Sequence, residues 1–139
     1  MRTVLSMIFS VMALAAFAGA ASAQDREVLF DETLPSGVRV QILSVGAGIS
    51  PSATSSVTVH YRGTLVDGKE FDSSYSRGNP ATFTLDRVIR CWTEGLQKIP
   101  VGAQARLTCP PATAYGQQGA RGIPPNSTLI FEVELLGIN

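Results

Sequence analysis

Residues 57–74 read VTVHYRGTLVDGKEFDSS, and this stretch decides the fold. Apolar and polar side chains alternate over residues 57–62, which is the period of a half-buried β-strand. Asp67–Gly68 is a pair typical of tight turns, so we expect the chain to turn there toward a short segment around Phe71. By strand parity His60 points outward, and we interpret it as a solvated residue rather than a base or a metal ligand. The stretch therefore predicts β structure with one buried face.

The same alternation returns twice in the C-terminal half of the chain. Apolar side chains occupy every second position of residues 129–135 and of residues 105–109, so both segments are predicted strands. Near the N-terminus, Pro35–Ser36–Gly37 is typical of a turn that leads into a further segment over residues 38–45. Residues 46–56 are rich in Gly, Ser and Pro, which predicts a loop. Most of the chain is therefore expected to be β structure.

One segment breaks the two-residue period and predicts a helix. Four apolar residues that follow Val88 fall on one helical face: Ile89, Trp92, Leu96 and Ile99. Asp86 is placed to cap the start of this helix, and Pro100 ends it. A single short helix packed on an antiparallel sheet is an α+β arrangement. Residues 109–125 carry many Pro, Gly and Gln residues, which predicts an ordered loop of the kind that often serves function.

The N-terminus has the pattern of a cleaved secretory signal. Met1–Arg2 precedes an apolar run over residues 4–17, and Ala21–Ser22–Ala23 is an Ala-x-Ala site. We expect cleavage after Ala23, followed by residence in the periplasm or outside the cell. An uncleaved membrane anchor is the alternative, although no basic stop-transfer cluster follows the apolar run.

The rest of the chain fits one domain, and its charge balance does not indicate a polyanionic partner. We expect residues 1–23 to be the signal peptide, 24–53 an N-terminal extension with the first strand, and 54–139 the main domain. The 139 residues include 11 Lys and Arg against 11 Asp and Glu, a balance that argues against a nucleic-acid or an anionic-membrane partner.

Two cysteines leave two possibilities open. Cys91 lies beside the helix stripe and Cys109 points inward from a predicted strand, so an exported domain could join them in a disulfide. The alternative is a pair of buried free thiols that pack as small apolar residues. A Cα separation beyond about 7 Å would exclude the bond. One His with two Cys does not make a credible metal site.

Three separated blocks, residues 57–74, 88–96 and 114–131, together carry a resemblance. Over roughly residues 54–139 the chain resembles the FKBP-type peptidyl-prolyl cis–trans isomerases, the immunophilins that bind tacrolimus and rapamycin. The resemblance implies a strongly twisted antiparallel β half-barrel wrapped around one short α-helix. It also implies a proline-binding pocket with Trp92 as its floor. The implied walls are Tyr61, Phe71, Val88, Ile89, Tyr115 and Phe131.

The resemblance further implies a polar edge and a mouth for this pocket. Asp72 and Arg77 match positions at the polar edge, and Ile123 lies in the loop that borders the mouth. Departures from the family pattern bear on the pocket's shape and its affinity for macrolides. Ala81 stands where the family often has an aromatic wall, and residues 110–113 lack the acidic and aromatic residues common before Tyr115.

The activity that the resemblance implies requires rotation about an X–Pro bond, whose barrier is about 18–20 kcal/mol. No covalent bond breaks, so no nucleophile, metal or cofactor is needed, and binding the twisted amide better than either planar isomer suffices. We assign Tyr115 as the hydrogen-bond donor to the substrate carbonyl. Asp72 would hold the polar rim through Tyr61 and Arg77.

Two functional interpretations stay open. The first is an exported, monomeric prolyl isomerase that acts on proline-containing polypeptides and binds tacrolimus-type or rapamycin-type macrolides. The second is a binding module or chaperone with little turnover. Trp92 and Phe131 taken alone could also be plain core residues, and Asp72 a plain turn residue. The polar residues of the predicted pocket favour the isomerase, because holding a peptide would need only the apolar lining.

Overall fold

A computed structural model describes residues 26–139, and the predicted signal segment with its cleavage site lies outside them. The described part of the chain contains seven strands. Their bounds are β1 (Phe30–Thr33), β2 (Arg39–Ser44), β3 (Ser56–Leu65), β4 (Glu70–Ser73), β5 (Ala81–Thr84), β6 (Gln104–Cys109) and β7 (Leu129–Ile138).

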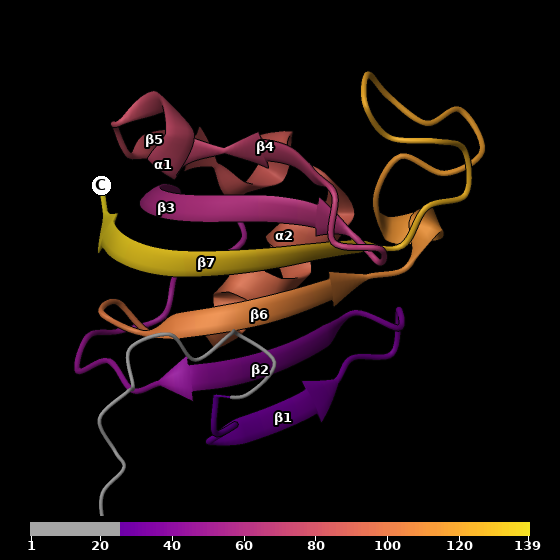
Figure 1. Cartoon of the computed structure of the whole chain (residues 1–139). Coiled ribbons are helices and arrows are strands. Elements are labelled where there is room, and N and C mark those ends of the chain that lie inside the picture. Colours follow the sequence, from indigo (N-terminus) through magenta and orange to yellow (C-terminus); the bar gives the residue numbers. More distant parts are fainter. Residues whose placement is uncertain (1–25) are drawn as a thin grey trace, which may run out of the picture.

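The seven strands form one open antiparallel sheet (Figure 1). The order is β1-β2-β6-β7-β3-β4, and β5 shares the outer edge of β3 with β4. All of these pairings are antiparallel. β1 stands at one end of this order and β4 at the other, so the sheet does not close into a barrel. The predicted α+β arrangement, an antiparallel sheet with one short packed helix, is confirmed.

The predicted strand parity is also confirmed by burial. Buried residues alternate with half-buried ones through β6, over residues 56–61 of β3 and over residues 129–135 of β7, as the sequence pattern requires. The inward side chains of these three strands form the main core: Val57, Val59, Tyr61, Ala105, Leu107, Cys109, Leu129, Phe131, Val133 and Leu135.

The helix that packs on the inner face is shorter than the sequence predicted. α2 spans Arg90–Gly95, and Ile89 precedes it without a side-chain cap. Asp86 does not cap α2 but lies in a separate 3-10 turn, η3 (Leu85–Arg87). Val88 between them is extended, with φ −125° and ψ 179°, so it interrupts the helical spacing. β-branched residues are stiff at χ1 and favour extended backbone, which fits the Val88–Ile89 pair.

The end of the helix follows the prediction. α2 continues as the 3-10 turn η4 (Leu96–Lys98), and Ile99 is extended, with φ −112° and ψ 117°. A residue before proline is disfavoured in the helical region, so Pro100 stops the run. Trp92, Leu96 and Ile99 are all buried, as expected for the apolar stripe.

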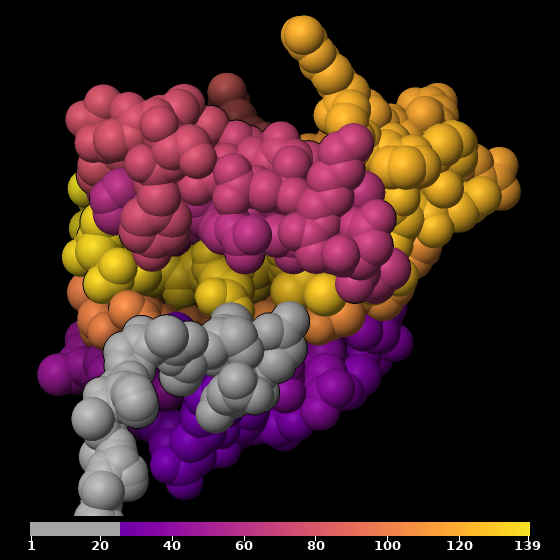
Figure 2. Space-filling view, in the orientation of Figure 1, coloured from indigo at the N-terminus to yellow at the C-terminus, as the bar shows by residue number. Residues whose placement is uncertain are grey.

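Turns and loops join these elements as their sequences suggest. Gly68 adopts φ +92°, and its amide donates to the Leu65 carbonyl at 2.9 Å, which closes the predicted turn between β3 and β4. After β6 the chain forms the 3-10 turn η5 (Pro111–Thr113) and then a long loop over residues 114–128. In the space-filling view this loop forms a lobe at one end of the sheet (orange to yellow, Figure 2).

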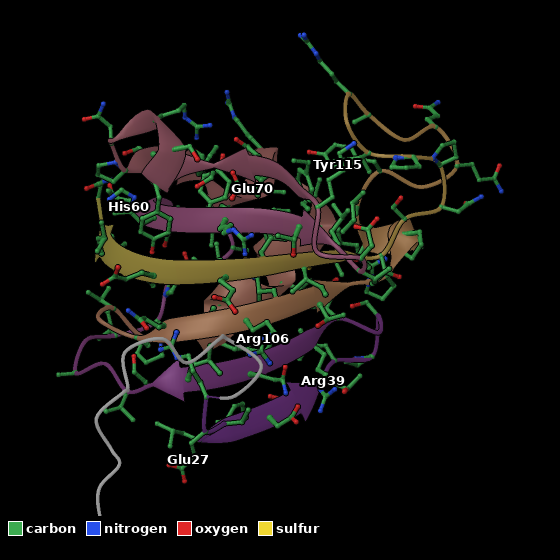
Figure 3. The ribbon with its side chains drawn as sticks, viewed as in Figure 1. Glu27, Arg39, His60, Glu70, Arg106 and Tyr115 are labelled. Atoms are coloured by element: carbon green, nitrogen blue, oxygen red, sulfur yellow. A yellow bond between two sulfur atoms is a disulfide. The ribbon has the colours of Figure 1, made fainter. Side chains whose placement is uncertain are left out.

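The outer face of the sheet carries charged and polar side chains, including Glu70 and Arg106 (Figure 3). His60 lies on this face, as strand parity predicted, but it is only half-exposed. Its Nδ1 is 2.8 Å from the Ser74 hydroxyl oxygen, and its ring stacks on Tyr75 at a centroid distance of 4.6 Å. His60 is therefore only partly solvated, because the first turn after β4 folds over it.

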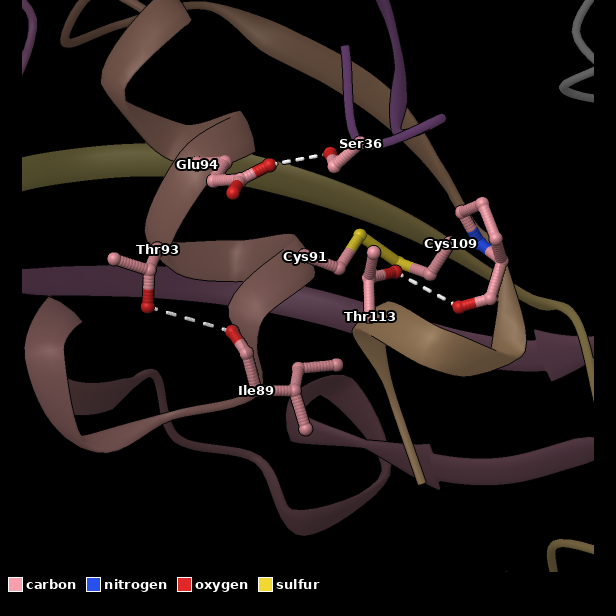
Figure 4. The surroundings of a disulfide bond; sticks show 8 residues. Ser36, Ile89, Cys91, Thr93, Glu94, Cys109 and Thr113 are labelled. Atoms are coloured by element: carbon pink, nitrogen blue, oxygen red, sulfur yellow. Dashed lines mark hydrogen bonds between the residues drawn. A yellow bond between two sulfur atoms is a disulfide. The ribbon is translucent and has the colours of Figure 1, made fainter. Parts of the chain in front are cut away.

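Cys91 and Cys109 form a disulfide with an S–S distance of 2.00 Å and a Cα separation of 5.6 Å (Figure 4). Both residues are fully buried. The bond joins α2 to the end of β6. The Ser36 hydroxyl also donates to Glu94, so the helix is attached to the turn before β2 as well.

In residues 26–139, none of the helices has the length and apolar character that crossing a membrane requires.

Candidate active site

A cavity of about 240 Å³ opens where α2, the ends of β3, β4 and β7, and the 114–128 loop meet. Its lining combines rings, aliphatic side chains and a few polar groups: Tyr61, Phe71, Asp72, Phe83, Arg87, Val88, Ile89, Trp92, Tyr115 and Phe131. Eight of the ten residues predicted to form the site therefore line one cavity. Arg77 and Ile123 are the two that do not.

Three rings surround the indole of Trp92 and make the floor of the cavity. The rings of Tyr61, Phe83 and Phe131 lie 5.2, 5.3 and 5.3 Å from it, at interplanar angles of 88°, 84° and 83°. Edge-to-face contacts of this kind are the favoured aromatic geometry and add to the gain from burial. The indole is 4% exposed, and its Nε1–H has no hydrogen-bond partner among the described residues. The floor is thus a rigid apolar surface.

Gly63 on β3 leaves room for two of these rings. A Cβ at this position would lie 2.6 Å from Cζ of Phe71 and 2.9 Å from Cε1 of Phe131. Contacts below 3 Å force a neighbour to move, so any larger residue here would push the rings into the cavity. Phe71 and Phe131 meet edge to face at 5.6 Å across this glycine.

The polar edge of the cavity is a closed network of three side chains. The Tyr61 hydroxyl donates to Asp72 Oδ2 at 2.5 Å, and Arg77 Nη1 donates to Asp72 Oδ1 at 2.6 Å. Arg77 Nη2 also donates to the Tyr61 hydroxyl oxygen at 3.0 Å. The guanidinium carbon lies 5.7 Å from the centroid of the Tyr61 ring. Arg77 therefore supports the site from behind the edge rather than lining it.

The charges of this network follow from its contacts. Burial alone raises the pKa of the Asp72 carboxyl, but the hydrogen bonds from Tyr61 and Arg77 and the charge of Arg77 together bring it below its ordinary value of 3.8. Burial, and then the hydrogen bond to Asp72, raises the pKa of Tyr61. The hydrogen bond to Asp72 also raises the pKa of Arg77. At neutral pH the network holds the Asp72 anion, the Arg77 cation and the uncharged Tyr61 phenol, whose hydroxyl donates a hydrogen bond to Asp72.

A single helical turn, α1 (Ser74–Arg77), positions Arg77. The Ser73 side chain caps it by accepting from the Ser76 amide at 3.2 Å, and Gly78 ends it in the left-handed region with φ +80°. Our sequence analysis missed this turn. Serine before the first helical residue and glycine after the last are the usual cap signals, and both were present.

Tyr115 is a tyrosine of the cavity lining whose hydroxyl stays outside the network of Tyr61, Asp72 and Arg77. It is 41% exposed, and within residues 26–139 its hydroxyl has no hydrogen-bond partner. Figure 3 shows Tyr115 at the base of the 114–128 loop, beside the end of the sheet. Backbone bonds hold this loop in shape: the Gly119 amide donates to the Tyr115 carbonyl at 3.1 Å, and the Asn126 amide to the Gly116 carbonyl at 2.8 Å. The hydroxyl is therefore placed to donate to a ligand.

Ile123 does not border the main cavity. It is 6% exposed and lines a separate hollow with Leu65, Lys69, Ala120, Gly122 and Pro124. The backbone bridge between Ala120 and Ile123 turns its side chain toward the core rather than toward the mouth. Its backbone bonds with Ala120 lie within the loop that carries Tyr115.

Two residues of the lining were missed by the sequence analysis. Phe83 lies on β5, where Ala81 and Phe83 are partly buried and packed against the core. The alternation of Ala81 and Phe83 with polar neighbours was a signal for this strand, although a weak one over four residues. Arg87 ends η3 just before Val88, and no sequence pattern distinguishes it from an ordinary surface arginine.

Among residues 26–139, no three His, Cys, Asp or Glu side chains gather closely enough to hold a metal ion.

Comparison with known proteins agrees with this geometry. Residues 48–136 match the family described as FKBP-type peptidyl-prolyl cis-trans isomerase. FkpA of Escherichia coli K12, named an isomerase of this type, is 51% identical over 107 residues, which cover 77% of this chain and 40% of FkpA. The isomerase Mip of Coxiella burnetii is 47% identical over 108 residues, which cover 77% of this chain and 47% of Mip. The chain thus matches less than half the length of either relative.

Solved structures show the same similarity. The crystal structure of FkpA from Escherichia coli superposes with a TM-score of 0.76 at 50% identity, over 78% of this chain and 51% of that one. A peptidyl-prolyl cis-trans isomerase from Pseudomonas syringae superposes with a TM-score of 0.73 at 42% identity, over 78% of this chain and 80% of that one.

Proposed function

Because the chain belongs to the FKBP-type peptidyl-prolyl cis-trans isomerase family, we propose that it accelerates rotation about X–Pro bonds while exported proteins fold. One observation carries this proposal. An indole enclosed by three rings forms the floor of an open cavity, and a phenol without a partner stands at its edge.

The apolar floor fits the chemistry of rotation. A planar X–Pro amide owes its barrier of about 18–20 kcal/mol to resonance, which also makes its carbonyl strongly polar. Rotation removes this resonance and lowers the polarity of the bond. A proline ring seated over Trp92, with Phe71 and Phe131 beside it, would leave the amide in surroundings that disfavour the planar form relative to the twisted one.

The polar groups would orient the substrate. Tyr115 would donate to a substrate carbonyl, since its hydroxyl has no competing partner in the described part of the chain. Asp72 faces the cavity as an anion held by Tyr61 and Arg77, so it cannot swing away from the twisted amide. Val88 and Ile89 would form the aliphatic wall. Macrolides of the tacrolimus and rapamycin type would compete for this same cavity.

We also propose that the protein acts in the periplasm or outside the cell, as a monomer. The pattern of residues 1–23 supports export, and so does the buried disulfide, since such bonds persist in oxidising compartments. The chain would then meet unfolded proline-containing polypeptides as they arrive.

An NMR exchange or chymotrypsin-coupled assay on Ala-Xaa-Pro-Phe peptides, with and without rapamycin, tests the function. Catalysed isomerisation that rapamycin blocks is the expected result. Binding of the peptides without any acceleration would instead identify a chaperone that holds proline-containing segments. Catalysis that rapamycin leaves unchanged would contradict the proposed competition of macrolides for this cavity.

A further inference from the structure

This inference rests on the proposed function and concerns the substrate class. We propose that Arg87 is a specificity-determining residue that makes the cavity prefer X–Pro bonds flanked by an acidic side chain. The partner it would take is a carboxylate on the residue directly before or after the proline.

Arg87 stands at the rim of the cavity. It lines the same hollow as Trp92 and Tyr115, and its side chain is exposed to solvent. It is the last residue of η3, and the extended Val88 that follows turns the chain toward α2. A peptide whose proline sits on the indole would have its neighbouring side chains at this rim.

The guanidinium of Arg87 is unpaired, which is unusual for this protein. Most arginines of the described chain bond a carboxylate or an amide; these are Arg26, Arg39, Arg62, Arg77, Arg90 and Arg106. Within residues 26–139, Arg87 makes no hydrogen bond and no ion pair, and Arg121 is the other arginine of which this is true. Arg121 does not line the cavity. The positive charge of Arg87 is thus available to a ligand.

The carboxylate of the cavity does not cancel this charge. Asp72 already accepts from Tyr61, Arg77 and the Ser73 amide, at 2.5, 2.6 and 2.9 Å. Its anion is therefore matched by the cation of Arg77. Asp86 precedes Arg87 in the chain but does not line the cavity, and the two form no ion pair in the described structure. Within residues 26–139, no carboxylate therefore neutralises the charge of Arg87 by direct contact.

An acidic side chain would gain from this field in two ways. The planar guanidinium can donate two parallel N–H hydrogen bonds, one to each carboxylate oxygen. A fixed positive charge at the mouth also draws anionic peptides toward it. Because Arg87 is exposed, the gain is modest, roughly two- to fivefold in kcat/KM at low salt.

The test compares peptides that differ only in charge. NMR exchange gives kcat/KM for Ala-Glu-Pro-Phe against Ala-Gln-Pro-Phe, and for Ala-Ala-Pro-Glu against Ala-Ala-Pro-Gln. We expect a Glu preference of about two- to fivefold in at least one pair, and its loss near 1 M salt, where charges are screened within about 3 Å. Arg87→Gln should bring the ratio of kcat/KM between the Glu and Gln peptides to one. Arg87→Glu should make the protein prefer a basic peptide, Ala-Lys-Pro-Phe, over Ala-Gln-Pro-Phe.

Arg90→Gln is the matched control. Arg90 is an exposed arginine three residues away, but it pairs with Glu94 at 2.6 Å and does not line the cavity. This variant should keep the Glu preference. A ratio of one in both peptide pairs for the unaltered protein would overturn the proposal. So would a preference that survives Arg87→Gln, or one that Arg90→Gln lowers equally.

The proposal can fail separately from the proposed function. Turnover of all peptides at equal rates would leave the isomerase intact and remove the role of Arg87. If no peptide is turned over, the proposed function fails instead. The fluorescence of Trp92, the single tryptophan of the chain, then measures whether the Glu peptides still bind more tightly than the Gln peptides. Equal binding in that case would overturn the role of Arg87 as well.

Discussion

The floor and the rim of the cavity are built in opposite ways. The floor residues Tyr61, Trp92 and Phe131 come from β3, α2 and β7, and each is 4% exposed. The rim residues Asp72 and Arg77 are 40% and 52% exposed in their side chains, and Tyr115 is 41% exposed on a loop. Under the proposed function, floor residues would serve stability and binding together, whereas changes at the rim would alter turnover while the fold remains. Substitutions on the two sides should separate these effects.

A substitution in the floor is expected to have the largest effect on stability. Phe131→Ala removes a ring that contacts Trp92, Phe71 and Tyr61, so the free energy of unfolding should fall by about 3–5 kcal/mol. Turnover should fall as well, because the cavity loses a wall. Urea unfolding measures the first effect. Leu136→Ala on the same strand is the control: Leu136 is 41% exposed, and its loss should change stability by less than about 1 kcal/mol. Equal losses in the two variants would contradict the assignment of Phe131 to the floor.

The disulfide connects the floor of the cavity to the strand that leads into the rim loop. Cys91 precedes Trp92, and Cys109 ends the strand from which the rim loop departs. The double variant Cys91→Ala/Cys109→Ala should lose about 3 kcal/mol of stability, since the bond joins residues separated by 18 positions. Thermal unfolding with and without dithiothreitol is the measurement. The reductant should lower the stability of the unaltered protein toward that of the variant and leave the variant unchanged; an unaffected double variant would show that packing alone holds α2.

At the rim, Asp72→Leu should reduce turnover without unfolding the protein. The substitution frees both Tyr61 and Arg77 from their shared acceptor, so the polar edge loses its geometry. We expect kcat/KM to fall roughly tenfold. The exposed Asp72–Arg77 pair contributes little to stability, so unfolding should change by no more than about 1 kcal/mol. Unchanged turnover would remove Asp72 from the mechanism.

Tyr115→Phe should have a smaller effect of the same kind. It deletes one hydroxyl that has no partner within residues 26–139, so stability should stay constant. Loss of one hydrogen bond to the substrate should cost about two- to tenfold in kcat/KM. Tyr75→Phe, an exposed tyrosine on the outer face that stacks on His60, is the matched control and should leave turnover unchanged. Equal rates for Tyr115→Phe and the unaltered protein would exclude the proposed donor.

The smallest expected effect is the pH dependence of the contribution that Asp72 makes to stability. The pKa of Asp72 lies below its ordinary value of 3.8, so its contribution to stability is present above that value and is lost as the pH falls through the lower folded-state pKa. The difference in unfolding free energy between the unaltered protein and Asp72→Asn should thus be constant above pH 3.8 and shrink below it. Urea unfolding from neutral to acid pH measures this difference. A difference that grows on acidification would mean that Asp72 is destabilised as an anion.

Local sequence patterns predicted those features of the structure that depend on residues close together in the chain. Alternation in 57–62, 105–109 and 129–135 predicted three strands and the direction of each side chain, because a strand buries every second residue whatever its partners are. The Gly68 turn and the stop at Pro100 follow from backbone sterics at single residues. The residues of the floor and the polar edge were predicted from the resemblance to a known family. The apolar pattern alone does not distinguish Trp92 from an ordinary core residue.

Other features depend on residues that are distant in the sequence, and only the tertiary structure decided them. The start of α2 moved from the position predicted by Asp86 to Arg90, because Val88 and Ile89 are extended where they face the cavity. Phe83 joined the lining through the pairing of β5 with β3, and Arg87 joined it from the 3-10 turn that follows β5. Ile123 left the lining because it packs against the core. By itself the sequence determined which residues alternate and where the chain turns, since those forces act between neighbours. Which rings meet over Trp92, and which charge stays free at the rim, depends on contacts between strands that no local pattern contains.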